Sequence, residues 1–397
     1  METLFYLLSV VQIAMGLYLI LQAIQWRGYV RRRMQTDPGF YSPKTAVLCP
    51  CRGMEPGLER NLLALCEFNY QNYEVFFILA SASDVAYSTV KRVAEQSRVK
   101  AHVVIAGKPD ACGEKVHNLR VAISELPAEF DVLAFADSDG RPGKGWLHGL
   151  VAPLHDARVG ATTTMRWLVP NDSGFASALL AAWNAPVVTM LTENGPNFCW
   201  GGGTAIRRSL FDQIGAMEAW EHSVSDDYSL TAALQQAGRP ILFLPECLTL
   251  SFVQTDFASL MEFTNRQIVT TRVYYPRVWT PAFATHFLYC FTFLLGLVIT
   301  AGEMIATRPA FHLATLLFLP PLLSAIRAAI RLAGVTEALP GSREQIMSQA
   351  WIYIILPIVT PFIYLANFVN SLFTRKIRWR GVTYELVSAT QTRIISY

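Results

Sequence analysis

The stretch DVLAFADSD, residues 131–139, decides the fold. Val132–Ala136 is an unbroken apolar run, which is typical of a strand covered on both faces, and it ends in Asp137 and Asp139. In an extended chain these two carboxylates point the same way and Ser138 points the opposite way. Two hard oxygen donors this close together suit Mg²⁺ or Mn²⁺. The alternative interpretation is an aspartate-rich turn that holds no metal.

The segments before this strand alternate between strand and helix patterns. This alternation predicts an α/β fold with a doubly wound, mostly parallel sheet. In such sheets ligands bind beyond the carboxyl ends of the strands, where polar residues follow three of the predicted strands: Arg52, then Ser81, Ser83 and Asp84, then Asp137, Ser138 and Asp139. We expect strands at Thr45–Cys49, Tyr73–Leu79 and His102–Ile105, and helices at Leu58–Phe68, Val85–Ser97 and Lys115–Leu126.

A second acidic pair, Asp226-Asp227, opens the helical pattern Tyr228–Ala237, with Ser225 as another possible cap. The pair is explained equally well in two ways. Carboxylates at a helix start cap it and suit the helix dipole. A carboxylate held there beside a cleft also serves as a general base that takes a proton from an attacking hydroxyl.

Two further segments have the composition of ligand-binding elements. The glycine run at 201–203 permits close approach of the backbone to a ligand, although its spacing is neither the Rossmann nor the Walker pattern. The amphipathic stretch Phe257–Tyr275 carries Arg266, Gln267 and Arg272. Such a helix rests on anionic headgroups, or its arginines pair with a diphosphate leaving group, and the two roles are compatible.

The composition predicts a membrane protein, because 52% of the 397 residues are hydrophobic and only 16% are charged. Four segments without Asp, Glu, Lys or Arg are long enough to cross a bilayer: Leu4–Ile24, Ala282–Gly302, Ala310–Ile326 and Trp351–Phe373. We therefore expect one N-terminal and about three C-terminal membrane segments. The predicted organisation is a transmembrane anchor at 1–26, a globular domain at 27–255, an amphipathic interfacial helix at 256–280, a membrane region at 281–374 and a basic tail at 375–397.

Charge predicts the orientation. Arg27 and the run 31–33 follow the first apolar segment, and such basic residues mark the cytoplasmic side, so the globular domain should face the cytoplasm. Three full C-terminal crossings would then place the basic tail outside. Because Pro357 and Pro361 interrupt the last segment, we expect a kinked re-entrant or interfacial element that returns to the cytoplasmic side. The seven cysteines form no CxxC pair and suit reduced thiols, and the net charge of +3 gives no reason to expect nucleic acid as a partner.

Several motifs follow one another along almost the whole chain: VLCPCRGMEPGLERNLLAL (47–65), YEVFFILA (73–80), KVHNL (115–119), ADSD (136–139), GGGTAIRRSLFDQIG (201–215), SDDYSLTAALQQAG (225–238) and KIRWRGVTYEL (376–386). Their order resembles that of the lipid-directed membrane glycosyltransferases with the GT-A fold, and among them most closely the ceramide glucosyltransferases.

The resemblance implies an inverting transfer of glucose from UDP-glucose to the primary hydroxyl of ceramide, with Mn²⁺ or Mg²⁺ on Asp137 and Asp139 and with Asp227 as the base. It implies a nucleotide-sugar site at Pro50, Arg52, Asp84, Lys115, Asn118 and Asp137. It implies contacts to the diphosphate or the acceptor from Gly202, Thr204, Asp226, Arg266, Gln267, Arg272, Trp379 and Arg380. The family's Q/RxxRW motif is missing between Ser251 and Pro276, where Arg266-Gln267 and Arg272 are the nearest substitutes.

Other functions are compatible with parts of this pattern. The same chemistry on diacylglycerol, a hopanoid or a polyprenyl phosphate keeps every motif. A polysaccharide synthase is disfavoured by the small number of membrane segments. A nucleotide-sugar-binding protein without turnover has little reason to keep Asp137, Asp139 and Asp227 together. Under all catalytic interpretations the partners are a UDP-sugar donor, a membrane lipid acceptor and the bilayer itself.

Overall fold

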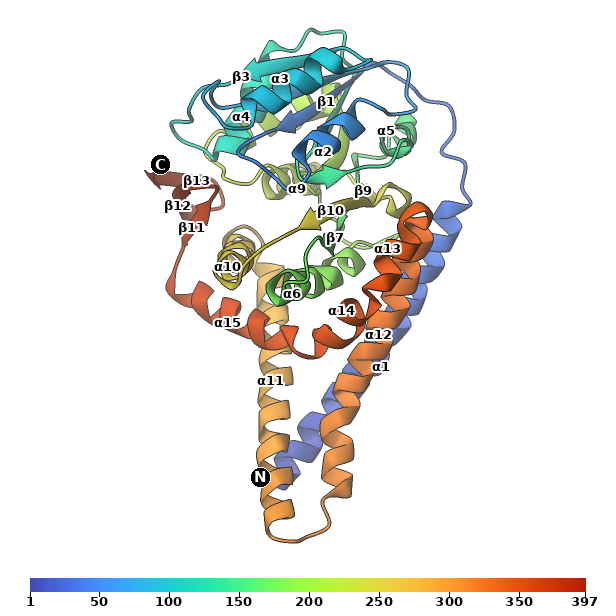
Figure 1. The fold of residues 1–397 in the computed structure, drawn as a ribbon, viewed down its shortest axis with the longest axis vertical. Helices are drawn as coiled ribbons and strands as arrows, with labels where there is room; N and C mark the ends of the chain where they lie inside the picture. The colour runs from blue at the N-terminus through green and yellow to red at the C-terminus, as the bar shows by residue number, and fades with distance from the viewer.

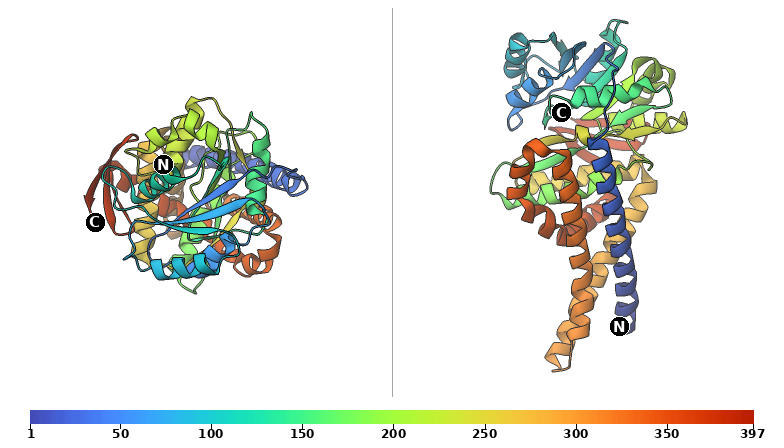
Figure 2. Two further views of the ribbon diagram at one scale, coloured as in Figure 1. Left: turned by 90° about the horizontal axis from the view of Figure 1, so that it is seen from above. Right: turned by 90° about the vertical axis from the view of Figure 1, so that its right-hand side faces the viewer.

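The computed structural model describes all 397 residues. An α/β domain stands at one end of three long helices, α1 (Glu2–Met34), α11 (Pro276–Ile305) and α12 (Phe311–Ala338) (Figure 1). All three are long and apolar enough to cross a membrane. The N-terminus lies at the far end of these helices and the C-terminus lies beside the α/β domain, as Figure 2 also shows.

The central sheet confirms the predicted fold class. Its seven strands lie in the order β3-β2-β1-β4-β8-β6-β9, and β1 pairs in parallel with both β2 and β4. Only β8 runs antiparallel to its neighbours β4 and β6. The strands are β1 (Thr45–Pro50), β2 (Tyr73–Leu79), β3 (Ala101–Ile105), β4 (Val132–Ala136), β6 (Ala161–Thr163), β8 (Gly203–Arg207) and β9 (Ile241–Phe243).

Helices cover both faces of this sheet, which explains why β1, β2 and β4 are apolar at successive positions. On one face Val47 and Cys49 of β1 pack against apolar residues of α2, α3 and α5. On the other face Ala46 and Leu48 pack against α4, α7, α8 and α9. These helices are α2 (Leu58–Leu65), α3 (Tyr87–Gln96), α4 (Glu114–Glu125), α5 (Trp146–Val151), α7 (Arg208–Gln213), α8 (Ala216–Trp220) and α9 (Asp226–Gln236).

A second layer lies below the central sheet, beside the upper ends of α1 and α12 (Figure 1). It contains a small sheet with the order β5-β10-β7 and the helices α6 and α10. A third sheet, β11-β12-β13, is formed by the chain after the last helix. The bounds are β5 (Gly140–Arg141), β7 (Arg166–Pro170), β10 (Thr249–Val253), α6 (Phe175–Asn184), α10 (Phe257–Tyr274), β11 (Lys376–Trp379), β12 (Val382–Ser388) and β13 (Gln391–Ser396).

Several boundaries differ from the sequence prediction, and α1 runs on to Met34, past the expected end of the anchor at 26. The amphipathic helix ends at Tyr274, before the expected boundary at 280, because Pro276 lacks an N–H and starts α11 at its first position. Helix α12 continues past the apolar segment to Ala338 and therefore contains Arg327 and Arg331 within its length. The basic tail is folded, since residues 376–396 form the β11–β13 sheet.

The last apolar segment is bent. Its two halves, Ala350–Ile358 and Thr360–Phe373, meet at an angle of 59°. They include α14 (Ala350–Ile355) and α15 (Thr360–Phe373), which follow the short α13 (Arg343–Ser348) and lie across the molecule below the α/β domain (Figure 1). The Asn367 Nδ2 amide donates to Thr264 Oγ1 of α10 at 3.0 Å. The segment thus packs beside the amphipathic helix, and the chain after it continues beside the α/β domain.

This arrangement predicts the sidedness of the two termini. In sealed inside-out vesicles, protease should remove a C-terminal tag as readily as it cuts an engineered site in the exposed loop at 98–100, while an N-terminal tag stays protected. The inserted loop site is the control for access to the α/β domain. If the protease left both terminal tags intact, the bent segment would have to cross the bilayer.

Candidate active site

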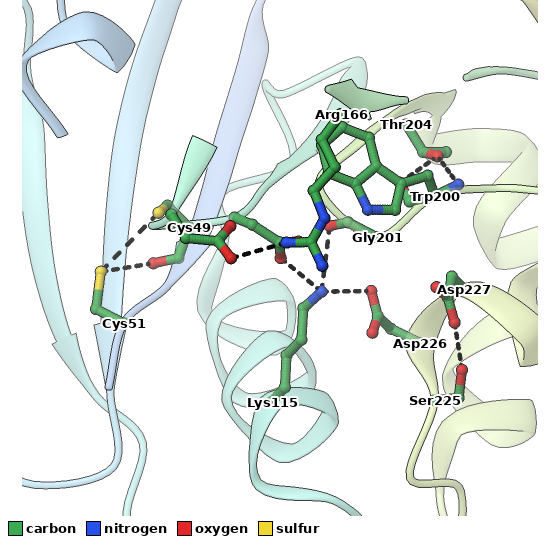
Figure 3. A network of polar contacts seen from close by, with 12 residues as sticks. Cys49, Cys51, Lys115, Arg166, Trp200, Gly201, Thr204, Ser225, Asp226 and Asp227 are labelled. Carbon is green, nitrogen blue, oxygen red and sulfur yellow. Dashed lines mark hydrogen bonds and ion pairs between the residues drawn. The ribbon is translucent and has the colours of Figure 1, made fainter. Parts of the chain in front are cut away.

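Lys115 joins three parts of the chain at the carboxyl edge of the sheet (Figure 3). It stands in the first turn of α4, and its Nζ lies 2.8 Å from Asp137 Oδ1 and 3.2 Å from Asp226 Oδ2. The same amine donates to the Gly201 carbonyl at 3.3 Å. Burial alone would lower the pKa of Lys115, but Asp137 and Asp226 raise it above its usual range. The lysine therefore stays charged.

The two carboxylates that share this lysine have different pKa values. Burial opposes the charge on Asp137, but Lys115 and Arg166 offset it and hold the pKa of that carboxyl below its usual range. Burial raises the pKa of Asp226 by more than Lys115 lowers it. The neighbouring Asp227 raises this pKa further, to about 6. Asp137 is therefore ionised at neutral pH, whereas Asp226 changes charge only slightly below it.

Asp139 is paired on one oxygen and unpaired on the other. Arg166 Nη1, at the start of β7, lies 2.8 Å from Asp139 Oδ2. Asp139 Oδ1 is buried and has no hydrogen-bond partner. A buried carboxylate oxygen without a donor is suited to a cation. Asp137 and Asp139 thus fit a divalent metal that keeps water and diphosphate oxygens as its other ligands, as Mg²⁺ and Mn²⁺ sites commonly do.

Glycine is required beside this pair. A Cβ on Gly202 would stand 2.5 Å from Asp137 Oδ2 and 2.4 Å from the Trp200 ring. Contacts that short do not occur, so a side chain at this position would displace the carboxylate. Gly202 is thereby explained by close approach of the chain to Asp137, and not by a left-handed backbone conformation.

Asp227 occupies a different environment from Asp226. It lies in the first turn of α9 and is partly exposed, and its Oδ1 accepts hydrogen bonds from Ser225 Oγ and, at 2.8 Å, from the Tyr228 N–H. Ser225 is also the N-cap of the helix, since its Oγ accepts from the Tyr228 N–H at 3.2 Å. Both donors act on one oxygen and fix the carboxylate at the helix start. The capping and general-base interpretations are therefore compatible here.

Arg266 of α10 is sandwiched between aromatic rings. Its guanidinium lies 4.7 Å from the ring centre of Trp379 in β11 and 5.2 Å from that of Phe263. Burial lowers the pKa of Arg266 to about 10, so it remains charged at neutral pH. The sequence contains no neighbouring arginine and tryptophan in this region. The fold forms such a pair from Arg266 and Trp379, which are distant in the chain. Both side chains line the cavity described below.

The β11–β13 sheet closes one side of the site. Arg380 donates to the Arg52 carbonyl at 2.5 Å and pairs with Glu55, both in the loop after β1. Arg52 in turn pairs with Glu114 at the start of α4. The Glu114 N–H donates to Tyr384 Oη of β12 at 3.2 Å. The tail is therefore a structural part of the site.

A single cavity of about 1720 Å³ extends from these residues to the long helices. Its upper part is lined by most of the residues expected from the sequence: Pro50, Arg52, Lys115, Asn118, Asp137, Asp139, Asp226, Asp227, Arg266, Gln267, Trp379 and Arg380. Its lower part is lined by residues of α1, α11, α12 and α15. Charged groups and membrane helices thus share one space.

Four expected residues lie behind this lining. Asp84 Oδ1 accepts from the Gly53 N–H at 2.9 Å and the Ala86 N–H at 2.8 Å, so it is used to hold two loops together. Thr204 Oγ1 donates to the Trp200 carbonyl at 2.8 Å. Arg272 donates to the Ser371 carbonyl of α15, and Gly202 lies beside Asp137 without reaching the cavity. The structure gives these residues positioning roles.

Sequence reasoning missed Arg166. It lies at the start of the short strand β7, and no charge pattern or motif around it in the sequence distinguishes it. Only the pairing of β7 with β10, together with the ion pair to Asp139, shows that it belongs to the site.

Comparison with known proteins identifies the class of enzyme. The chain matches the model of glycosyl transferase family 21 over residues 4–392. It belongs to this glycosyltransferase family. Over 215 residues it is 21% identical to ceramide glucosyltransferase 1 of Caenorhabditis elegans, in an alignment that covers 53% of this chain and 45% of that protein. The match therefore spans about half the length of this curated relative.

Solved structures resemble the chain more distantly. Glucosyl-3-phosphoglycerate synthase from Mycobacterium tuberculosis, in complex with Mn²⁺ and UDP-glucose, is 14% identical, with 62% of this chain and 82% of that chain covered and a TM-score of 0.36. GalNAc-T7 with UDP, GalNAc and Mn²⁺ is 12% identical, with 56% and 48% covered and a TM-score of 0.40.

The raised pKa of Asp226 predicts a pH-dependent stability. Between the ordinary pKa of 3.8 and the folded value of about 6, the folded state binds a proton that the unfolded state does not. Stability should therefore fall as the pH rises through this window, by up to about 3 kcal/mol. Thermal unfolding in detergent between pH 4 and 7 should show this fall in the wild type and a smaller one in Asp226→Asn. The exposed Asp212→Asn is the control, and equal slopes in wild type and Asp226→Asn would contradict the assignment.

Proposed function

We propose that this chain is an inverting, metal-dependent glycosyltransferase that moves glucose from UDP-glucose to the primary hydroxyl of ceramide at the cytoplasmic face of a membrane. The observation that carries the proposal is the single cavity that joins Asp137, Lys115 and Asp227 to the apolar helices. A polar donor and a lipid acceptor need such a space, because one reactant is dissolved in water and the other is held in the bilayer. The family membership and the distant ceramide glucosyltransferase relative support the same reaction class.

The donor end of the cavity has the groups that a nucleotide diphosphate requires. Asp137 and Asp139 would hold Mn²⁺ or Mg²⁺, which when bound neutralises charge on the diphosphate. At this end of the cavity Arg266 is a cation without a carboxylate partner, and its planar guanidinium suits phosphate oxygens. Charge that develops on the leaving group is then met by fixed cations in a buried site.

Asp227 is the base in this proposal. It takes the proton from the acceptor hydroxyl as that oxygen forms a bond to the anomeric carbon, and the bond from this carbon to the diphosphate breaks on the opposite side. A single displacement of this kind inverts the anomeric centre. Asp226 is less suited to the role, because it is buried and paired with Lys115, while Asp227 is partly exposed in the cavity.

The long helices fit a lipid acceptor. Moving a two-chain lipid out of the bilayer costs about 0.8 kcal/mol for each buried CH₂, so the acceptor has to be met at the membrane. The amphipathic α10 and the bent α14–α15 segment lie below the α/β domain, beside the upper parts of the long helices (Figure 1). The hydroxyl of the lipid acceptor would then reach Asp227 while its acyl chains remain between the helices.

The reaction can be tested directly with competing acceptors. Purified protein in nanodiscs with Mn²⁺, UDP-glucose, ceramide and diacylglycerol should yield glucosylceramide as the main lipid product. If glucose were found on diacylglycerol alone, the proposed mechanism would stand, but the acceptor would be diacylglycerol and not ceramide. Loss of product in the presence of EDTA, with recovery on adding Mn²⁺, is expected because the two aspartates need a cation to hold the diphosphate.

Two substitutions should separate turnover from donor binding. Asp227→Asn should lower kcat by about 10²- to 10⁴-fold and leave UDP affinity near normal, because it removes only the base. Asp139→Asn should weaken Mn²⁺-dependent UDP binding by about tenfold or more, because it removes a metal ligand.

Calorimetry with UDP and single-turnover assays would measure both effects. Asp212→Asn, an exposed aspartate on α7, should change neither quantity. Equal loss of UDP binding in the Asp227 and Asp139 variants would show that the two roles are wrongly assigned.

A further inference from the structure

Helix α12 carries two arginines without a counter-charge, of which Arg331 is buried and Arg327 half-buried. Arg331 is 1% exposed, and its Nε and Nη2 have no hydrogen-bond partner; the Nε of Arg327 is likewise buried and unpartnered. The two residues are one helical turn apart and lie on the same side of the helix. Two unpaired like charges inside a helix bundle carry a large free-energy cost. Such residues are kept only where an interaction with an opposite charge compensates this cost.

The packing of α12 against α1 shows how deep in the membrane these arginines lie. A Cβ on Gly16 would meet Leu323 at 2.9 Å, and a Cβ on Gly334 would meet Trp26 at 2.6 Å. Helices α1 and α12 therefore run side by side in the same direction, and both arginines lie at the level of the part of α1 between Gly16 and Trp26. The apolar run of α1 ends in this part, at Ile24. The arginines thus lie where hydrocarbon gives way to lipid headgroups.

The protein supplies no carboxylate at this height. The nearest acid along α12 is Glu337, which already pairs with Arg27 at 2.5 Å and Arg31 at 2.9 Å. The polar rings around Arg327 belong to His286 and Tyr364, whose centres lie 4.4 Å apart, and neither provides a negative charge at neutral pH. The compensating anion therefore has to come from outside the chain.

The cavity connects one of these arginines to the bilayer-facing part of the molecule. Arg327 lines its lower part together with Ser324, His286 and Leu323. The cations that line the donor end belong to other parts of the chain, among them Lys115, Arg166, Arg266, Arg52 and Arg380. The α12 pair is thus a second positive centre, surrounded by apolar helix surface and separate from the groups that would hold the diphosphate.

We propose that Arg327, with the charge of the buried Arg331 behind it, binds the anionic headgroup of a membrane phospholipid, whose acyl chains lie among α1, α11 and α12. A phosphodiester is a suitable partner because guanidinium groups bind its oxygens through paired hydrogen bonds. The ligand class follows from two requirements, a negative charge to neutralise the arginines and an apolar chain to occupy the surrounding surface. This inference does not depend on the sugar donor or the acceptor.

The experiment compares lipid compositions by thermal unfolding. Wild-type protein in phosphatidylcholine nanodiscs should gain roughly 3–6 °C in Tm when part of the lipid is replaced by phosphatidylglycerol, since a ligand that binds only the folded state stabilises it. The double variant Arg327→Met/Arg331→Leu should gain nothing from phosphatidylglycerol. In phosphatidylcholine alone it should unfold at the same temperature as the wild type or higher, because the uncompensated charges are gone.

The control is Arg277→Gln, which removes an exposed arginine near the start of α11 and should keep the full phosphatidylglycerol effect. Native mass spectrometry should find phosphatidylglycerol retained on the wild type and on Arg277→Gln, and lost from the double variant. Three results would overturn the proposal: an equal phosphatidylglycerol effect in the double variant, a double variant less stable than wild type in phosphatidylcholine, or equal stabilisation of the wild type by inorganic phosphate. Either of the first two results would mean that the arginines have a structural role. The third result would mean that they bind a free anion and not a lipid.

Discussion

The shared ion pair of Lys115 with Asp137 and Asp226 is the interaction on which the site depends. The amine brings together the end of β4, the start of α4 and the start of α9, which are separated in sequence and meet only at the carboxyl edge of the sheet. In a buried setting such a contact is strong if all partners are present and very costly if one is removed. It therefore fixes the position of the metal-suited carboxylates relative to Asp227, the neighbour of Asp226 in the chain.

A second arrangement depends on this one. The β11–β13 sheet holds Trp379 against Arg266, and its Tyr384 accepts from the backbone N–H of Glu114, directly before Lys115. The site thus has a rigid half built on the large sheet and a half assembled from α10 and the tail. An arginine held by stacking, without a carboxylate partner, keeps its hydrogen-bonding groups available for a phosphate.

The sequence predicted the elements better than it predicted their contacts. Val132–Ala136 and its two aspartates were recognisable because a strand buried on both faces is uninterruptedly apolar. Asp226 and Asp227 could be placed at a helix start, but their different burial depends on Lys115, which no local pattern reveals. The Arg266–Trp379 stacking and the Arg166–Asp139 pair join segments far apart in the chain, so they could not be derived from spacing. Asp84 carries the right charge in the right loop, yet its oxygen is already used by backbone donors.

The place of β11–β13 in the chain has a consequence for biosynthesis. Residues 376–386, which supply Trp379, Arg380 and Tyr384, are translated after α11 and α12. The α/β domain, complete in sequence before α11, can fold on the ribosome, but it then lacks one wall of its cavity. That wall can be added only once the two long helices have been synthesised. The order of translation thus couples the assembly of the site to the insertion of the chain into its membrane.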